Sequence, residues 1–246
     1  MLTTAQLMHS LCNRKPFPIC CAAPAVRTSS PALDFLFDLA FRLPPLLESV
    51  DAVEKIDDNN ICISDRLKNE LASLERALAV WLGSFCESKS DTGRDITASA
   101  VAHSTDRSPG EHEFKSATPP SLFELACESL CRICLLLVYQ SQLSLESFGG
   151  SARLAQSRYH SSAVVCADSL RLLVGLLAGV AERPIAQGLA LRAPLHFLEQ
   201  WYSFSGDNDG LLWCAETTKA VRARAPYLQW DALMPWSLMP LIKVPA

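Results

Sequence analysis

The chain has 246 residues, a formal net charge of −4 and 20% charged side chains. This length allows one large or two small domains with a sizeable apolar core, and the lack of excess positive charge argues against a protein that binds DNA or RNA unaided. Only ten glycines are present, which disfavours glycine-rich phosphate loops and turn-rich β architecture, so the composition predicts a soluble, mostly helical globular protein.

Residues 1–30 are predicted to form a flexible N-terminal arm. They contain no acidic residue and carry Arg14, Lys15 and Arg27, but they lack the apolar stretch of a secretory signal peptide. An acidic-poor start also occurs in mitochondrial transit segments. The small number of basic residues and the four prolines up to Pro31 favour a disordered arm instead.

Three helices are predicted between this arm and residue 86. The first, over 31–41, follows a serine and a proline, which are preferred residue types at a helix start. A second begins at the proline pair 44–45, and a third covers about 64–87. The third helix has large apolar residues at a spacing of three and four, namely Leu67, Leu71, Leu74, Leu78, Trp81 and Leu82. We therefore expect Trp81 to be a structural core residue.

Residues 87–120 are predicted to be a disordered insertion. They show no apolar periodicity and contain too few large apolar groups to offset the entropy of ordering them. The helical segments on both sides are each half-apolar, and each needs the other to bury that surface. The sequence therefore predicts a single helical domain over 31–246 that is interrupted by this insertion.

Four further helices are predicted, over about 121–146, 151–181, 186–204 and 209–224. In the last of them Trp213 follows two leucines, and we expect it to be a second core residue. No segment shows the alternation typical of a strand. The predicted fold class is all-α, a multi-helix array of roughly seven to nine helices with a long disordered insertion.

The longest apolar runs, 133–139 and 172–181, are shorter than the roughly 20 residues that span a bilayer. Charged residues flank both runs closely. We therefore expect buried core helices at these positions and no membrane partner.

Ten cysteines are present, and without a secretory signal we expect free thiols. Cys127, Cys131 and Cys134 share one helix face. Their apolar neighbours favour small core residues, with Cys131 as a structural core position, while metal binding and redox chemistry are the alternatives. No four Cys or His residues have the spacing of a structural zinc site, so the sequence predicts neither bound zinc nor another cofactor.

His196 and Glu199 lie three positions apart on a predicted helix, where they could supply two metal ligands. A boundary helix with one polar face explains the same pair without further ligands, and we favour that interpretation.

A set of acidic and amide residues resembles the motifs with which terpene cyclases hold magnesium over a diphosphate. Ile61 stands where the first motif needs a third acid, and Leu212 stands where the second needs a hydroxyl ligand. The matching residues are Asp57 and Asp58, which precede Asn59 and Asn60, and Asn208 and Asp209, which are followed at a distance by Glu216. The resemblance implies, as an alternative function, an α-helical enzyme of secondary metabolism with a degenerate acidic magnesium site.

Five segments of the sequence are informative because of the order in which they occur along the chain. They are LPPLLESVDAV (43–53), LERALAVWL (74–82), LFELACESLCRICLLLVYQSQL (122–143), SSAVVCADSLRLLVGLL (161–177), and APLHFLEQWYSF (193–204) with LLWCAETTKAVRAR (211–224). Together they resemble the C-terminal regulatory region of fungal binuclear zinc-cluster transcription factors.

The DNA-binding module of that family needs six cysteines in two close triplets, and Cys12, Cys20 and Cys21 do not supply them. The resemblance therefore implies the regulatory helical domain without its DNA-binding cluster, in a non-enzymatic protein of the nucleus or cytoplasm. It further implies a protein partner or DNA-binding subunit, a small-molecule effector, no direct DNA binding by this chain alone, and an association with a secondary-metabolite gene cluster.

Overall fold

A computed structural model describes residues 4–16, 30–53, 61–90, 121–147, 152–179 and 184–224. This part of the chain is helical throughout and contains no strand, which confirms the all-α prediction. Its helices are α1 (Thr4–Asn13), α2 (Pro31–Val53), α3 (Ile61–Ser90), α5 (Leu122–Ser147), α6 (Ala152–Gly179), α7 (Pro184–Ser205) and α8 (Asn208–Arg224).

The chain divides into two compact units, Met1–Leu173 and Val174–Ala246, where a single domain was expected over 31–246. The boundary falls within α6, so the last turns of that helix belong to the second unit. Most of the predicted insertion, residues 91–120, lies outside the described residues. The prediction of disorder was wrong at its start, because α3 continues as a helix through Ser90.

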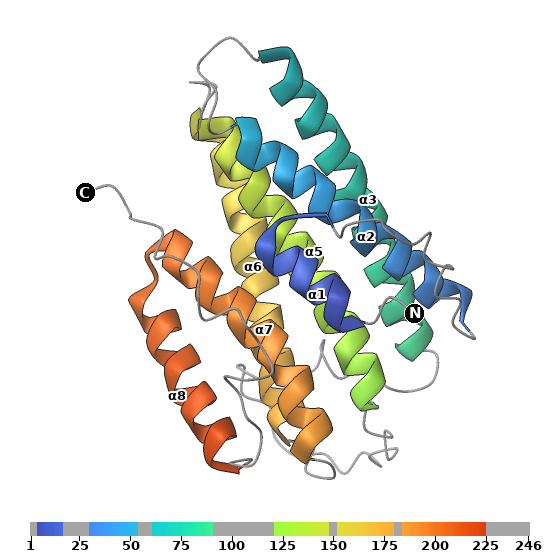
Figure 1. Ribbon diagram of the computed structural model, residues 1–246, viewed down its shortest axis with the longest axis vertical. Coiled ribbons are helices and arrows are strands. Elements are labelled where there is room, and N and C mark those ends of the chain that lie inside the picture. The colour runs from blue at the N-terminus through green and yellow to red at the C-terminus, as the bar shows by residue number, and fades with distance from the viewer. Residues whose placement is uncertain are drawn as a thin grey trace, which may run out of the picture. The chain divides into compact units, whose positions relative to one another are not determined.

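Helix α5 is the core of the first unit (Figure 1). Most of its 26 residues are buried, because it carries apolar side chains on all sides and α2 and α3 both pack against it. Its start is fixed by a capping box: the Ser121 backbone N–H donates to Glu124 Oε2 at 2.8 Å, and the Glu124 N–H donates to Ser121 Oγ at 3.2 Å.

Helix α2 is continuous, whereas the sequence predicted two helices separated at Pro44–Pro45. Each proline removes one backbone donor, which normally ends or bends a helix. Here Leu43, Pro44 and Leu47 continue the buried face of the helix. We infer that burial against α3 and α5 offsets the lost hydrogen bonds.

The predicted leucine stripe of α3 lies in the core, where Leu71, Leu74 and Leu78 are buried. Trp81 is only 4% exposed, and its Nε1–H donates to the carbonyl of Ala32 on α2 at 2.6 Å. The Trp81 ring also stacks on Phe85, with ring centroids 4.6 Å apart. Trp81 therefore holds the start of α2 against α3.

Helix α1 lies within the segment that was expected to be a flexible arm, and Leu7 and Leu11 are buried. A ten-residue helix has little stability alone, so this one depends on its packing against α2. At its end, Arg14 has a left-handed backbone (φ 51°) and bonds Asp51 Oδ1 of α2 at 2.8 Å. The flexible-arm expectation was therefore wrong for Thr4–Asn13.

In the second unit, α7 and α8 form an antiparallel hairpin around a tight turn. Gly206 has φ 74°, a conformation that favours glycine, and the Asp207 N–H donates to the Tyr202 carbonyl at 2.9 Å. Asp207 Oδ1 then accepts the Gly210 N–H at 2.9 Å and caps α8. Arg224, at the far end of α8, donates to the Ala178 carbonyl at 3.2 Å.

Candidate functional site

The first unit contains a group of mostly half-buried polar side chains, of which only Gln142 is fully buried, and we call this group the polar seam. Its members come from three helices: Lys68 and Glu75 from α3; Tyr139, Gln142 and Glu146 from α5; and Tyr159 and Ser162 from α6. Gln142 Nε2 lies 3.4 Å from Glu75 Oε2, and Tyr139 is hydrogen-bonded to Ser162. The seam thus links α5 to α3 and to α6.

Helical spacing explains why the polar side chains of α5 share one side. Tyr139, Gln142 and Glu146 are separated by three and four positions, which places them above one another on one helix face. On α3, Lys68 and Glu75 are seven positions apart, or about two turns, and also share a face. The seam is therefore fixed by rigid helices and not by loops.

Two buried oxygen atoms in the seam have no hydrogen-bond partner. One is Oε1 of Gln142, a residue that is 1% exposed, and the other is Oε2 of Glu146. A buried acceptor without a donor costs about 1–3 kcal/mol, so most native proteins avoid it. Both atoms are acceptors, and the group that would satisfy them must supply donors or positive charge.

The ionisable groups of the seam are shifted by burial. Burial, reinforced by Glu75, raises the pKa of Tyr139 to about 12. Burial likewise raises the pKa of Tyr159 and that of Glu146, while the positive charge of Lys68 opposes the shift at Glu146. Both phenols therefore keep their protons at neutral pH, so they can donate hydrogen bonds but cannot act as bases.

An ion pair and a buried thiol precede the seam residues on α5, and a second buried thiol lies on α6. Glu128 and Arg132 are paired at 2.7 Å with both side chains largely buried. The thiol of Cys131 donates to the Leu78 carbonyl at 3.5 Å, and that of Cys166 donates to the Arg132 carbonyl at 3.2 Å.

These thiols are buried, as are Cys127 and Cys134 on the same helix. Burial raises the pKa of Cys134 and of Cys166 to about 12, and that of Cys131 well above its ordinary value. At neutral pH Cys131, Cys134 and Cys166 are protonated, so these three thiols are poor nucleophiles and poor metal ligands. Within the described ranges, no group of three or more His, Cys, Asp or Glu residues could hold a metal ion.

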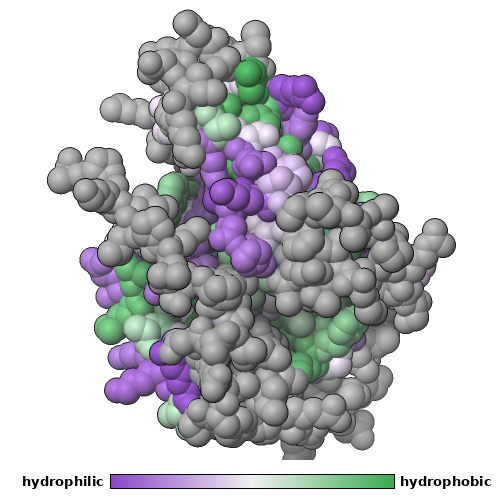
Figure 2. Space-filling model, in the orientation of Figure 1, coloured by the Kyte–Doolittle hydropathy of each residue, from purple (hydrophilic) through white to green (hydrophobic). Residues whose placement is uncertain are grey.

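The two tryptophans that were predicted as core residues differ in their burial. Trp81 is buried with a bonded indole N–H, whereas Trp213 is half-buried on α8. Hydrophilic and hydrophobic residues are mixed over the visible face of α8 in Figure 2. Leu212, the residue before Trp213, is 60% exposed.

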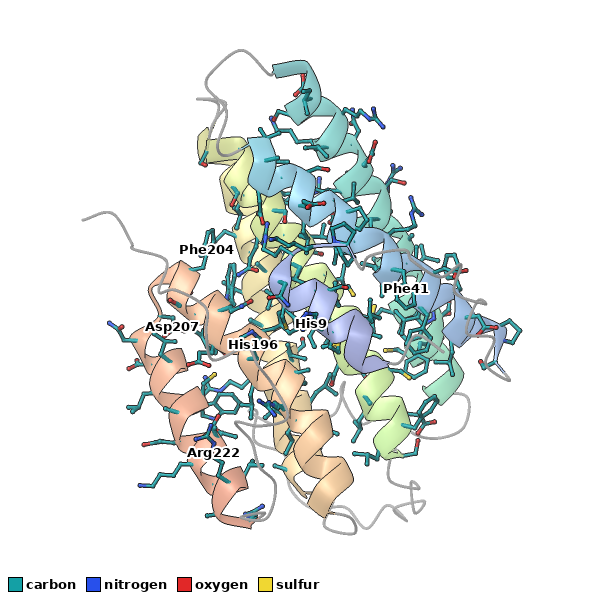
Figure 3. The ribbon with its side chains drawn as sticks, in the orientation of Figure 1. His9, Phe41, His196, Phe204, Asp207 and Arg222 are labelled. Carbon is teal, nitrogen blue, oxygen red and sulfur yellow. The ribbon has the colours of Figure 1, made fainter. Side chains whose placement is uncertain are left out.

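His196 lies on α7, and Asp207 lies in the turn that follows this helix (Figure 3). His196 Nε2 is 3.1 Å from Gln200 Nε2, one helical turn away, while Glu199 is exposed. Burial, with a smaller contribution from Arg192, lowers the pKa of His196. The hydrogen bond therefore joins His196 to Gln200, and Glu199 points to solvent.

The acidic residues of the enzyme alternative are only partly described. Asp57 and Asp58 lie outside the described residues. Asn208 and Glu216 are both exposed and are eight positions apart, which is about 12 Å along α8. Neither of these two is placed in a buried site.

Sequence reasoning did not single out the polar seam. Gln142 and Glu146 lie in the predicted helix over about 121–146, of which only the apolar run 133–139 was considered, and Glu75 was not considered. The available signal was the recurrence of polar residues at a spacing of three and four in an otherwise apolar helix.

One helical stretch, Arg158–Ala178, is long and apolar enough to cross a membrane when judged by length and composition alone. It has 21 residues with a mean hydropathy of 1.6, and 39% of the window is buried. Core helices of soluble proteins pass the same test, so a single such helix is weak evidence.

The fold and the seam define a helical protein with a partly buried group of polar side chains in its first unit. No family model, curated protein or solved structure matches this chain.

Proposed function

We propose that this chain is a non-enzymatic regulator-like protein, similar to the C-terminal regulatory domain of fungal binuclear zinc-cluster transcription factors but without their DNA-binding cluster. The observation that carries the proposal is the order of the family-like segments. They fall on α2 (43–53), α3 (74–82), α5 (122–143), α6 (161–177), α7 (193–204) and α8 (211–224), in that order. Regular helices at these positions are what a domain of that kind requires.

The chemistry of the described interior supports a regulatory role over catalysis. Tyr139 and Tyr159 of the polar seam and Cys131 and Cys134 of α5 keep their protons at neutral pH, because burial raises the pKa of each, so none of these four is an activated nucleophile or base. We infer that the chain acts by contact with a protein partner or DNA-binding subunit, in the nucleus or cytoplasm, and responds to a small-molecule effector. Its target genes would be those of a secondary-metabolite gene cluster.

A reporter experiment tests this function. The full chain is fused to an unrelated DNA-binding module and expressed beside a reporter gene that carries the module's site. We expect reporter output to differ from that of the module alone, and we expect the Trp81→Ala fusion to lose the difference because the core is destabilised. Equal output from the wild-type fusion and the module alone would count against the proposal.

Deletion of the gene separates the regulator from the enzyme alternative. A regulator should change transcript levels of neighbouring genes. Constant transcripts together with loss of one metabolite and accumulation of its precursor would favour the enzyme, and Asp57, Asp58, Asn208 and Glu216 would then be the first residues to substitute.

We also expect no sequence-selective DNA complex with this chain alone. The net charge of −4 provides little attraction to phosphate. Among the cations near the end of α8, Arg224 already bonds the Ala178 carbonyl, and cations are expected at a helix C-terminus. Fluorescence anisotropy at physiological salt measures this, and a selective complex at nanomolar protein would contradict the expectation.

A further inference from the structure

Helix α1 is bound to the first unit through one apolar face and one ion pair (Figure 1). Leu7 and Leu11 are 1% and 0% exposed, and α1 packs against α2. Two leucines four positions apart share one face of a helix. Three positions after Leu11, the Arg14 Nε–H donates to both carboxylate oxygens of Asp51, at 2.8 and 3.1 Å. The first unit therefore already binds an amphipathic helix that carries two leucines and ends in a cation.

The end of α1 indicates that the contact with Asp51 is specific. The Lys15 N–H donates to the Ser10 carbonyl at 3.1 Å, which is the long bond of a Schellman motif. Glycine normally takes the left-handed position of that motif, but here Arg14 does, with φ 51°. This backbone is unfavourable for a residue with a Cβ atom. What the side chain gains in return is its contact with Asp51, and Ser141 Oγ of α5 lies 3.5 Å from Arg14 Nη2.

Few other interactions hold α1 in place. Besides the two leucines, the buried side chains over Leu7–Asn13 are the small Cys12 and the polar Ser10. The helix has ten residues, fewer than the roughly 12–15 that an isolated helix needs even for marginal stability. The side chains of Arg14 and Asp51 are 25% and 33% exposed, and ion pairs in contact with solvent contribute little. A helix with the same chemistry and a larger apolar face can therefore displace α1.

We propose that the surface beneath α1 is a docking site for an amphipathic helix of a protein partner, and that α1 occupies this site in the free chain as an intramolecular competitor. The site, which we call the α1 site, is the face of α2 against which α1 packs, with Asp51 at one end and Ser141 of α5 beside it. The inference rests on the proposed function for the existence of a partner, and it adds the surface on which that partner binds.

The chemistry of α1 defines the partner helix. It carries two leucines four positions apart and a cation three positions later, because these groups hold α1 on the same surface. Glu48, which is exposed and lies three positions before Asp51 on α2, adds a second carboxylate near that end. An acidic residue in place of the cation would face like charge there and would be rejected.

A labelled peptide of residues 1–16 probes the α1 site, with the full chain as its receptor. Fluorescence anisotropy measures the affinity. The Leu11→Asp chain should bind the peptide about tenfold or more tightly than the parent chain, because a buried aspartate displaces α1 and removes the intramolecular competitor. His9 is exposed on the same helix, so His9→Asp is the matched control and should bind as the parent chain does.

Charge reversal tests the ion pair separately from the leucines. Asp51→Arg, introduced into the Leu11→Asp chain, should weaken binding of the natural peptide by about tenfold, because two like charges then meet. A peptide with Arg14→Asp should recover most of that loss. Non-specific apolar binding would show no recovery, because the leucines are the same in both peptides.

Arg14→Asp in the full chain keeps the proposal falsifiable if Leu11→Asp does not fold, because it weakens the attachment of α1 without burying a charge. This chain should also bind the natural peptide more tightly than the parent. Equal affinity of the peptide for the parent, Leu11→Asp and Arg14→Asp chains, or no binding to any of them, would overturn the proposal. So would a concentration-dependent dimer of the parent chain in sedimentation that Leu11→Asp abolishes, because α1 of a second copy would then be the occupant.

The peptide and reporter experiments fail independently. Reporter activity without peptide binding would reject this inference and leave the proposed function in place. Peptide binding without reporter activity would reject the proposed function and leave a helix-binding surface whose partner acts elsewhere.

Discussion

The two units are stabilised in different ways. The first is organised around α5, which is buried along most of its length, and its stability comes from apolar side chains on three or more helices. In the second unit, the α7–α8 hairpin depends on local backbone geometry at Gly206, Asp207 and Gly210. Phe197, Leu198 and Trp201 of α7 are buried as well, so both units bury apolar side chains, and the hairpin differs in having a specific turn that joins its two helices.

The polar seam is an exception within the first unit. Burial that stabilises apolar side chains imposes a cost on Gln142 and Glu146, whose oxygens lack donors. The hairpin shows the opposite arrangement, since the polar group of its turn, Asp207, is hydrogen-bonded to the helix that it caps. Incomplete satisfaction of polar groups in an otherwise well-packed core is a feature associated with binding sites.

The largest expected effect tests the distributed core. Trp81→Ala removes a buried ring and its bond to Ala32, and it should lower the free energy of unfolding by about 3–5 kcal/mol. The neighbouring Val80, which is 67% exposed, is the control, and Val80→Ala should stay within about 0.5 kcal/mol of the parent. Urea denaturation measures both.

Trp213→Ala sharpens the same comparison, because Trp213 is only half-buried. Its cost should be clearly smaller than that of Trp81→Ala. Equal costs would show that the two tryptophans are equivalent anchors, as the sequence alone predicted.

The next effect tests the turn. A Cβ atom added at Gly210 would lie closer than 3.0 Å to the Tyr202 ring, so Gly210→Ala should cost about 1–3 kcal/mol through overpacking. Gly175 on α6 has no atom within 4 Å of such a Cβ, and Gly175→Ala should instead stabilise by about 0.5–1 kcal/mol. Thermal unfolding of the two variants measures the difference, and a neutral Gly210→Ala would show that the ring moves aside without strain.

The apolar periodicity predicted most helices because it depends on burial, which is the dominant force in this fold. The stripe Leu67–Trp81 specified the buried face of α3, and the run around Leu135 specified a core helix. The same reasoning failed at Pro44–Pro45, where tertiary packing overrides a local helix-breaking signal. It failed again at α1, whose apolar residues are buried by packing against α2 and whose end is fixed by the bond from Arg14 to Asp51.

The seam could not be predicted for a related reason. A polar residue in an apolar helix can face solvent or another polar group, and only the packing of α3, α5 and α6 decides between the two. Glu75 and Gln142 are 67 positions apart in the chain, so no local pattern brings them together.

A smaller effect concerns the cap of α8. Asp207→Ala removes the acceptor for the Gly210 N–H and should cost about 1 kcal/mol. Asp207→Asn keeps an oxygen acceptor and should recover most of that loss. If the alanine variant unfolds at the same temperature as the parent, the hairpin is held by interhelical packing and the contrast between the units is weaker than we describe.

The smallest effect is a pH dependence of the second unit. Burial, and to a lesser degree Arg192, lowers the pKa of His196 below its ordinary value of 6.5. A histidine whose pKa is lower in the folded state binds protons more weakly there than in the unfolded chain, so protonation favours unfolding. The contribution of His196 to stability is therefore complete above pH 6.5 and is lost as the pH falls toward the folded-state pKa. His196→Gln should therefore lose part of the decline in stability below pH 6.5. Arg192→Gln should make that decline somewhat smaller, because removing the second cause brings the folded-state pKa of His196 closer to 6.5. Urea midpoints measured across this range, with the ring pKa followed by NMR, test the sign. A ring pKa above 6.5 would mean that a carboxylate and not the apolar surroundings controls His196, and the hairpin would then depend on charge pairing as well as on its turn.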